Sequence, residues 1–193
     1  SSFASRWLSA RLTNFFEICP DLSLKIESIN SIDEFSKANF SIAILWGDGW
    51  SDFEYELLMS SSSYILGNRK IYDQTKSLSL EEAMKKTPLL SDGFYGGHGG
   101  MKAWHKTANL EYKPSKSSLK ITDAFTRLQA VIDGQGIALW DELVDEEIKS
   151  GKLFYISDIE LQGFGYHLVY KNKNALSIEE QKFRKWIKGV LQK

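Results

Sequence analysis

Apolar residues recur at helical spacing in the first part of the chain. Between Phe3 and Ile18 they fall every three or four positions, with charged residues between them. This spacing predicts one amphipathic helix, which Pro20 should end because proline lacks the backbone N–H and restricts the residue before it. From Leu22 to Ile26 apolar and polar residues alternate, and this alternation predicts a half-buried strand.

Longer apolar runs predict strands that are covered on both faces, because such strands are apolar throughout rather than alternating. Phe40 to Trp46 is one such run. A short apolar stretch, Tyr64 to Leu66, follows the serine run from Ser60 to Ser63, and Tyr166 to Tyr170 is interpreted as a further strand late in the chain. The chain therefore alternates predicted helices and strands.

Two helices are predicted to begin with a serine that is followed three residues later by a glutamate. Ser79 and Glu82 open a brief helix that must stop before Pro88. Ser177 and Glu180 open the last helix, whose apolar stripe must pack on a sheet. The stripe consists of Phe183, Trp186, Ile187, Val190 and Leu191.

The stretch from Gly134 to Leu139 predicts a switch from helix to strand. It follows an apolar helical pattern that contains Leu128 and Val131. Gly134 suits the left-handed cap of a helix, Gly136 lets the backbone turn tightly, and the residues up to Leu139 have the apolarity of a buried strand. An α/β fold is the architecture that uses such a switch.

Composition limits the classes of function. A chain of 193 residues that is 42% hydrophobic and 25% charged can bury the core of one domain or of two small lobes. The formal net charge of -1 and a pI near 6.3 disfavour nucleic-acid binding by this piece. The single cysteine, Cys19, excludes an internal disulfide and any multi-cysteine metal site. The sequence shows neither a membrane span nor the layout of a signal peptide, so we expect a soluble, cytoplasmic protein.

Three segments together carry a resemblance to a known family. In their order and spacing, they resemble the effector-binding domain of LysR-type transcriptional regulators. The segments are Ser2 to Leu8, Trp46 to Gly49 and Leu119 to Leu139. The similar branch contains the glycine-cleavage activator and the β-lactamase regulators. The resemblance extends over nearly the whole chain, through Gly151 to Leu153, Tyr166 to Val169 and the last helix.

The resemblance implies an α/β fold with two Rossmann-like lobes joined by two crossover strands, as in type 2 periplasmic binding proteins. Lobe I would hold residues 1–60 and 166–193, and lobe II residues 61–165. It further implies that a winged helix-turn-helix is absent from this chain, and it leaves open whether the first strand is absent too. Ligands in such folds lie in the cleft between the lobes, near strand and helix ends.

Two helix starts are candidates for effector binding. Ser1 and Ser2 offer hydroxyls and free backbone N–H groups that suit a carboxylate, and the resemblance gives Ser2 a role in effector binding. Thr122 and Asp123 occupy the start of the helix that ends at Gly134. At both places the alternative is a plain helix cap, and Asp123 then only complements the helix dipole.

Aromatic residues supply the other candidates. Tyr166 matches a tyrosine that faces effector in the β-lactamase regulators; the alternative is a hinge tyrosine bonded to backbone. Trp46 to Trp50, with Trp140, can wall a pocket, although tryptophans in such numbers also suit a core. Where relatives usually have aspartate and arginine this chain has Ser41 and Leu45, and Met101 replaces a tryptophan, so the effector need not be shared.

Other chemistry finds little support. The segment from Tyr95 to Gly100 lacks the lysine and hydroxyl residue of a phosphate loop and suits either a connector or a ligand-covering lid. His98, His105 and His167 are not spaced as a metal set, and no Gly-x-Ser-x-Gly elbow is present. We expect no enzyme activity, no cofactor and no metal.

The expected function is therefore effector sensing by a DNA-binding regulator. The effector would be an amino acid, a short peptide or another carboxylate, although a weakly polar aromatic compound would also suit the tryptophans. Members of the family pair antiparallel through the first helix and the following strand, so we expect a homodimer of this fragment and a tetramer of the intact protein. We expect DNA to bind only through the missing part, and we expect no membrane partner. The alternatives are a solute-binding protein of a transport system and a domain that only assembles.

Overall fold

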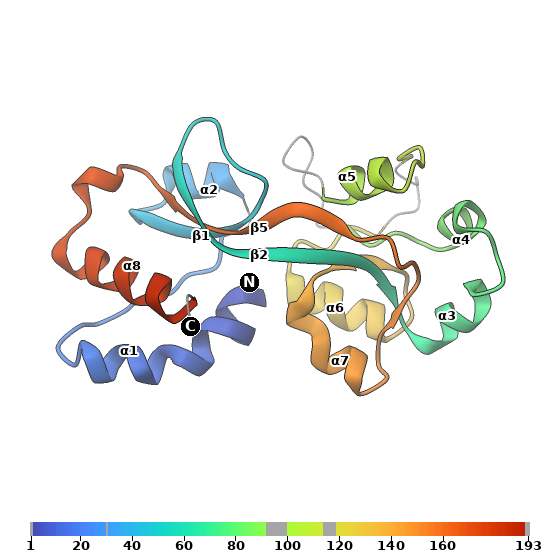
Figure 1. The fold of residues 1–193 in the computed structure, drawn as a ribbon, viewed down its shortest axis with the longest axis horizontal. Coiled ribbons are helices and arrows are strands. Elements are labelled where there is room, and N and C mark those ends of the chain that lie inside the picture. Colours follow the sequence, from blue (N-terminus) through green and yellow to red (C-terminus); the bar gives the residue numbers. More distant parts are fainter. Residues whose placement is uncertain (1, 30, 92–99, 114–118, 192–193) are drawn as a thin grey trace. The chain divides into compact units, whose positions relative to one another are not determined.

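The chain divides into two compact units joined by two neighbouring strands. The computed structural model describes residues 2–29, 31–91, 100–113 and 119–191. The first unit holds Ser1–Ser60 and Gly163–Lys193, and the second holds Ser61–Gln162. Strands β2 (Glu54–Gly67) and β5 (Leu161–Tyr170) each pass from one unit into the other, and the strand order is β1-β5-β2-β3 with β4 paired to β2 (Figure 1). The α/β fold with two crossover strands is confirmed.

The predicted opening helix is present, but its first half is irregular. A π-helical turn and a 3-10 turn precede regular helix α1, and the helical run ends just before Pro20 as predicted. The first unit contains η1 (Ala4–Leu8), η2 (Ser9–Arg11), α1 (Leu12–Ile18), α2 (Ile32–Lys37), β1 (Ile42–Gly47), η4 (Lys173–Ala175) and α8 (Ile178–Leu191).

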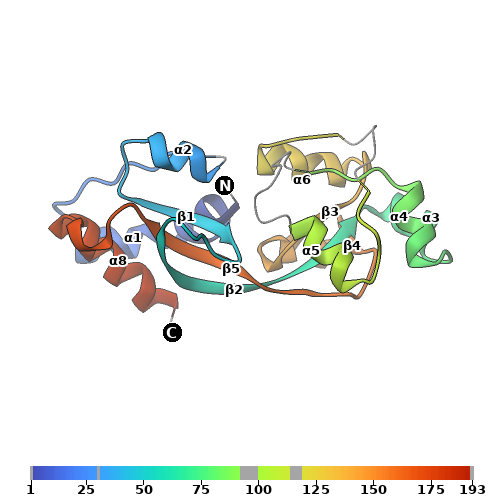
Figure 2. The ribbon, with the colours of Figure 1, turned by 90° about the horizontal axis from the view of Figure 1, so that it is seen from above.

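Helices cover both faces of the sheet in the first unit. Strands β1 and β5 pair antiparallel, from Ile42 opposite Tyr170 to Gly47 opposite Gly165. On one face Ala43 and Val169 pack with Phe35 of α2. On the other, α1 and α8 pack together through Phe15, whose ring centroid lies 5.0 Å from that of Trp186 (Figure 2).

The predicted strand from Leu22 to Ile26 is wrong, because residues 22–29 belong to no strand or helix. A strand needs a neighbour that exchanges backbone hydrogen bonds with it. No described strand pairs with this segment, and Ile26 remains 49% exposed. Alternation of apolar and polar residues indicates which side chains would share a face of a strand, but it does not indicate whether a second strand lies beside them.

The second unit builds its core between β2, β3 and two helices. Leu66 of β2 and Ala138 of β3 pack with Leu128 and Val131 of α6. Helix α5 lies on the opposite side of these strands, where fully buried Trp104 donates its indole N–H to the Ile159 carbonyl at 2.9 Å (Figure 1). The elements are α3 (Arg69–Thr75), α4 (Leu80–Lys86), α5 (Gly100–Thr107), α6 (Ala124–Ile132), β3 (Ala138–Trp140), η3 (Glu142–Val144), α7 (Asp145–Lys149) and β4 (Phe154–Tyr155).

The local signals predicted from sequence are confirmed. Ser79 and Glu82 form a capping box at the start of α4, and Ser177 and Glu180 bond reciprocally before α8. Gly134 closes α6 with a φ of +79°, and the N–H of Gln135 reaches back to the carbonyl of Ala130 at 2.9 Å. This is the Schellman cap that favours glycine.

Gly136 then allows two segments to approach closely. Its neighbour Ile137 donates its N–H to the Pro88 carbonyl at 2.9 Å, and a Cβ at position 136 would overlap that same carbonyl oxygen. The glycine is therefore required by a backbone contact rather than by its own dihedral angles. The contact fixes where β3 begins.

A single carboxylate ties both crossing strands to the last helix. Glu56 of β2 accepts two bonds from Arg184 of α8, at 2.8 and 2.6 Å, and one from the Tyr170 hydroxyl of β5 at 2.6 Å. Lys188 and Lys173 lie 3.0 and 3.2 Å from the same carboxylate, whose side chain is only 18% exposed. Arg184 first, and then Tyr170 and the two lysines, hold the pKa of Glu56 well below its ordinary value of 4.5.

Of the helices formed by the described residues, none has the length and apolarity needed to cross a membrane.

Gly136→Ala should lower the free energy of unfolding by about 3 kcal/mol, because backbone cannot move aside as a flexible side chain can. Gly189→Ala is the matched control: Gly189 lies in α8 with open space around its Cα, so alanine should raise stability by up to about 1 kcal/mol. Urea denaturation of both variants measures the two changes. Equal effects would show that the Pro88 contact does not constrain the switch.

Stability should fall in acid through Glu56. Because the folded-state pKa of this carboxyl lies below its unfolded value, its contribution is complete above about pH 5 and is lost progressively as the pH falls toward the folded pKa. Glu56→Gln should cost about 2 kcal/mol at pH 7 after allowance for solvent screening, and less at pH 3, where the unfolded-state carboxyl is already protonated. Denaturant titrations at both pH values measure this. A penalty independent of pH would contradict the assignment.

Candidate functional site

Two predicted site residues of the first unit, Trp46 and Tyr166, lie on neighbouring strands, and Tyr166 contacts Phe3 near the start of the chain. Trp46 of β1 lies directly opposite Tyr166 of β5, so both side chains stand on the sheet face that α1 and α8 cover. The ring of Phe3 lies 4.9 Å from that of Tyr166 and 5.0 Å from that of Trp7. Ser2, the residue before Phe3, is the first described residue of the opening helix and is half-buried.

The packing in this cluster is tight. Phe3 is 1% exposed and Tyr166 7% exposed. Trp46 is half-buried and stacks on Phe164 with 4.8 Å between the ring centroids. The cluster thus offers aromatic walls, one tyrosine hydroxyl and the Ser2 hydroxyl, next to a π-helical turn of a kind that is frequent at functional sites. Ser1 lies outside the described residues.

The start of α6 in the second unit divides into a cap and an exposed hydroxyl residue. Asp123 accepts bonds from the N–H of Thr126 at 2.8 Å and from its hydroxyl at 2.7 Å, and these bonds lower the pKa of Asp123. Asp123 therefore serves as the N-cap of α6. Its neighbour Thr122 is exposed.

Arg127 connects this helix start with Trp140, and sequence reasoning missed it. Its guanidinium donates to the carbonyls of Ile121 and Thr122, at 2.6 and 3.3 Å, and lies 5.3 Å from the centre of the Trp140 ring. One arginine in an amphipathic helix looks like any solvated residue. Only the fold brings Trp140, thirteen residues further along the chain, against its guanidinium.

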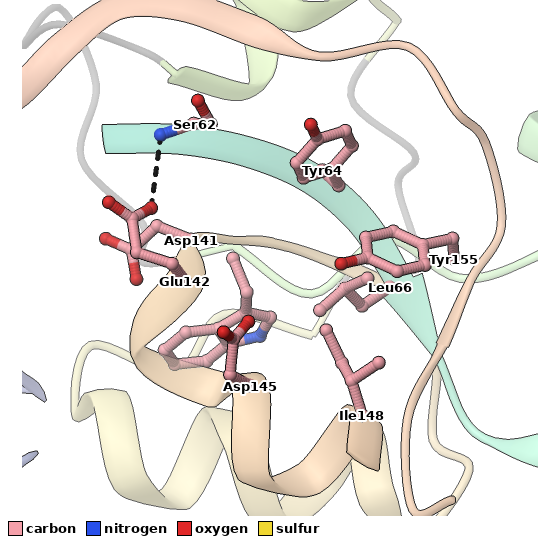
Figure 3. Close-up of a pocket in the computed structure, with 9 residues that line it drawn as sticks. Ser62, Tyr64, Leu66, Asp141, Glu142, Asp145, Ile148 and Tyr155 are labelled. Carbon is pink, nitrogen blue, oxygen red and sulfur yellow. Dashed lines mark hydrogen bonds between the residues drawn. The ribbon is translucent and has the colours of Figure 1, made fainter. Parts of the chain in front are cut away.

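The second unit also contains a pocket that the sequence did not reveal. Its volume is about 370 Å³, and it lies between β2, β4, the end of β3 and α7 (Figure 3). Nine residues line it: Ser62, Tyr64, Leu66, Trp140, Asp141, Glu142, Asp145, Ile148 and Tyr155. Two sequence features belong to this pocket: the alternate positions 62, 64 and 66 on one strand, and the acidic run after Trp140. Neither feature indicates that the two segments face each other.

Trp50 and the described histidines are structural. Trp50 is 8% exposed, belongs to the core beside Phe35, and packs edge-on against His167. Burial lowers the pKa of both His105 and His167, and each ring bonds to a backbone carbonyl, at 2.7 and 3.1 Å. Within residues 2–29, 31–91, 100–113 and 119–191, no three metal-ligating side chains gather as a metal site. His98 and residues 95–99 lie outside the described part.

Phe3→Ala should lower the free energy of unfolding by about 3 kcal/mol, because it removes a fully buried ring that contacts both Trp7 and Tyr166. Tyr166→Phe keeps the ring and should cost about 1 kcal/mol or less, the net value of one hydrogen bond. Thermal and urea unfolding measure both. A large loss in Tyr166→Phe would make the hydroxyl a structural group.

Comparison with known proteins places this geometry in a family. The sequence profile of the LysR substrate binding domain matches residues 1–192. The glycine cleavage system transcriptional activator of Escherichia coli K12 is 24% identical over 189 residues, covering 96% of this chain and 61% of that protein. The transcriptional activator AmpR of Providencia stuartii is 25% identical over 196 residues, covering 100% of this chain and 64% of that protein. The chain thus spans about three fifths of the length of these relatives.

Solved structures agree on the fold. The effector domain of the transcriptional regulator AmpR of Pseudomonas aeruginosa has a TM-score of 0.81 at 20% identity, covering 100% of this chain and 92% of that one. The AmpR effector-binding domain of Citrobacter freundii has a TM-score of 0.76 at 21% identity, covering 100% and 94%. The fold and the family profile agree, and the chain belongs to the LysR substrate-binding domain family.

Proposed function

We propose that this chain is the regulatory domain of a LysR-type transcriptional regulator, which binds a small-molecule effector and controls DNA binding through an attached helix-turn-helix part. The family profile along residues 1–192 carries this proposal, and the relatives named above are transcriptional regulators. They are neither enzymes nor transport proteins by name. A catalytic role and a solute-binding role are accordingly not favoured, and a cytoplasmic location follows from the proposed function.

The proposed effector contacts are hydroxyl and aromatic groups of both units. In the first unit they are Ser1, Ser2, Trp46 and Tyr166. Trp46 lies opposite Tyr166 on the neighbouring strand, and Tyr166 packs on Phe3. In the second unit they are Thr122 and Trp140, with Asp123 holding the helix start in place. Hydroxyls at helix starts suit a carboxylate, so an amino acid, a short peptide or another carboxylic acid is the proposed class.

The proposed mechanism is a shift between arrangements of the two units. Strands β2 and β5 join the two units, so a change in the arrangement of the units would involve these strands. An effector that contacts both units and binds one arrangement more tightly moves the population toward it by that difference in affinity. The attached DNA-binding part would respond to the shift.

The surface of the first unit supports pairing of two copies. Phe16 and Ile18 of α1 are 38% and 62% exposed, and Ile26 in the segment that follows α1 is 49% exposed. The segment 22–29 has no strand neighbour among the described residues, and exposed apolar side chains close together on a surface favour association. We infer a homodimer of this domain through residues 3–18 and 22–26, and a tetramer of the full-length protein.

Effector binding is tested by thermal shift of the purified chain against amino acids, short peptides and carboxylic acids. A compound at about 100 times its dissociation constant should stabilise the fold by roughly 2.7 kcal/mol, which raises the melting temperature by several degrees. Ser2→Ala, Thr122→Val and Tyr166→Phe should each reduce the shift.

Ser91→Ala is a suitable control, since this half-buried serine belongs to the second unit and is not among the proposed contacts. It should retain the full shift. A compound that stabilises all four variants as strongly as the parent would contradict the assigned contacts.

A further inference from the structure

The pocket of the second unit is acidic, and no basic residue lines it. Asp141, Glu142 and Asp145 contribute three carboxylates, while the nine lining residues include neither lysine nor arginine. Glu142 accepts the N–H of Ser62 at 3.1 Å, and this bond links the loop after β3 to β2 (Figure 3). Asp145 forms an ion pair with Lys149 at 3.9 Å, but both side chains are exposed, so this pair contributes little.

The walls between these carboxylates are apolar and aromatic. Leu66 and Ile148 belong to the pocket, and the rings of Tyr64 and Tyr155 lie 5.1 Å apart at an edge-to-face angle of 80°. Burial and then the nearby Glu160 carboxylate raise the pKa of Tyr64, in keeping with an electronegative surrounding. Aromatic faces and carboxylates together attract organic cations.

A buried donor in the same pocket lacks an acceptor. Trp140 is 6% exposed and lines the pocket, and its indole Nε1–H has no hydrogen-bond partner among the residues that the structure describes. A buried N–H without an acceptor is costly, so such groups are rare and call for an explanation. An acceptor atom on a bound molecule would satisfy it.

We propose that this pocket binds a small organic cation that joins an ammonium group to an apolar body bearing a hydroxyl or carbonyl oxygen. The carboxylates of Asp145 and Glu142 take the ammonium group, the rings of Tyr64 and Tyr155 cover the apolar body, and the indole N–H of Trp140 donates to the oxygen. A volume of about 370 Å³ lies at the low end of the roughly 300–1,000 Å³ of small-molecule sites, which limits the ligand to a small amine.

This site is separate from the effector contacts proposed above. All nine lining residues belong to the second unit, and Trp140 alone is shared with those contacts. The chemistry also differs, since hydroxyls at helix starts suit an anion while this pocket suits a cation. The two proposals can therefore fail independently.

Three matched compounds test the pocket. Tyramine, its neutral alcohol 2-(4-hydroxyphenyl)ethanol and the anion 4-hydroxyphenylacetate share one ring and one phenol and differ in charge. Titration of the ¹⁵N-labelled chain follows the indole N–H signals, with that of Trp140 assigned through Trp140→Phe. Tyramine should shift the Trp140 signal saturably and bind at least about tenfold more tightly than the other two, and its affinity should fall as salt is added.

Matched variants identify the carboxylates. Asp145→Asn and Glu142→Gln should each weaken tyramine binding about fivefold or more, because each removes one charge and keeps a side chain of the same shape. Glu146→Gln makes the same charge change next to Asp145 on α7, but Glu146 does not line the pocket, so binding should stay within about twofold. Ser2→Ala and Tyr166→Phe should also leave tyramine binding unchanged.

Equal binding of all three compounds would overturn the proposal. So would a Trp140 signal that does not move, or an equal loss in Glu146→Gln and Asp145→Asn. If these results arise while Ser2→Ala and Tyr166→Phe still reduce a carboxylate's thermal shift, the pocket proposal fails and the proposed function stands.

Discussion

The pairing of β2 with β5 is the constraint on which the rest of the structure depends, because these two strands carry the chain from one unit to the other. Within the first unit they lie very close: a Cβ on Gly165 of β5 would stand 2.5 Å from the Met59 carbonyl oxygen of β2. Glu56 of β2 adds polar contacts, because its carboxylate accepts hydrogen bonds from Tyr170 of β5 and Arg184 of α8. Breaking either contact would weaken the pairing of the two strands that join the units.

The two units offer different chemistry at their candidate sites. The first presents hydroxyl and aromatic groups around Phe3, where Trp46 and Tyr166 face each other across β1 and β5. The second presents carboxylates around aromatic rings, with an unsatisfied indole N–H at Trp140 among the described residues. An anion-binding surface and a cation-binding pocket in one regulatory domain would let two kinds of signal meet in the same protein.

Local and paired features differ in how far sequence predicts them. Local features were predicted because each depends on a few adjacent residues. They are the Schellman cap at Gly134, the capping boxes at Ser79 and Ser177, and the end of the first helical run before Pro20. The strand at residues 22–26 was predicted wrongly because a strand depends on a distant neighbour. The resemblance to LysR regulators supplied the arrangement of lobes that periodicity alone does not.

The candidate site residues also differ in how far the sequence predicts them. Trp46 and Trp140 were named from their positions at strand ends, and Tyr166 from the resemblance to the β-lactamase regulators. Arg127 and the lining residue Asp145 were missed because their partners lie far along the chain. The role of Asp123 as a helix cap was one of two readings left open by sequence, and its bonds to Thr126 identify it.

A crystal structure of the chain with the carboxylic compound that stabilises it most would test the central claim most directly. Effector sensing by both units predicts electron density for the compound in contact with the hydroxyls of Tyr166 and Thr122 in the same molecule. Density that touches neither residue, or only one unit, would contradict the account.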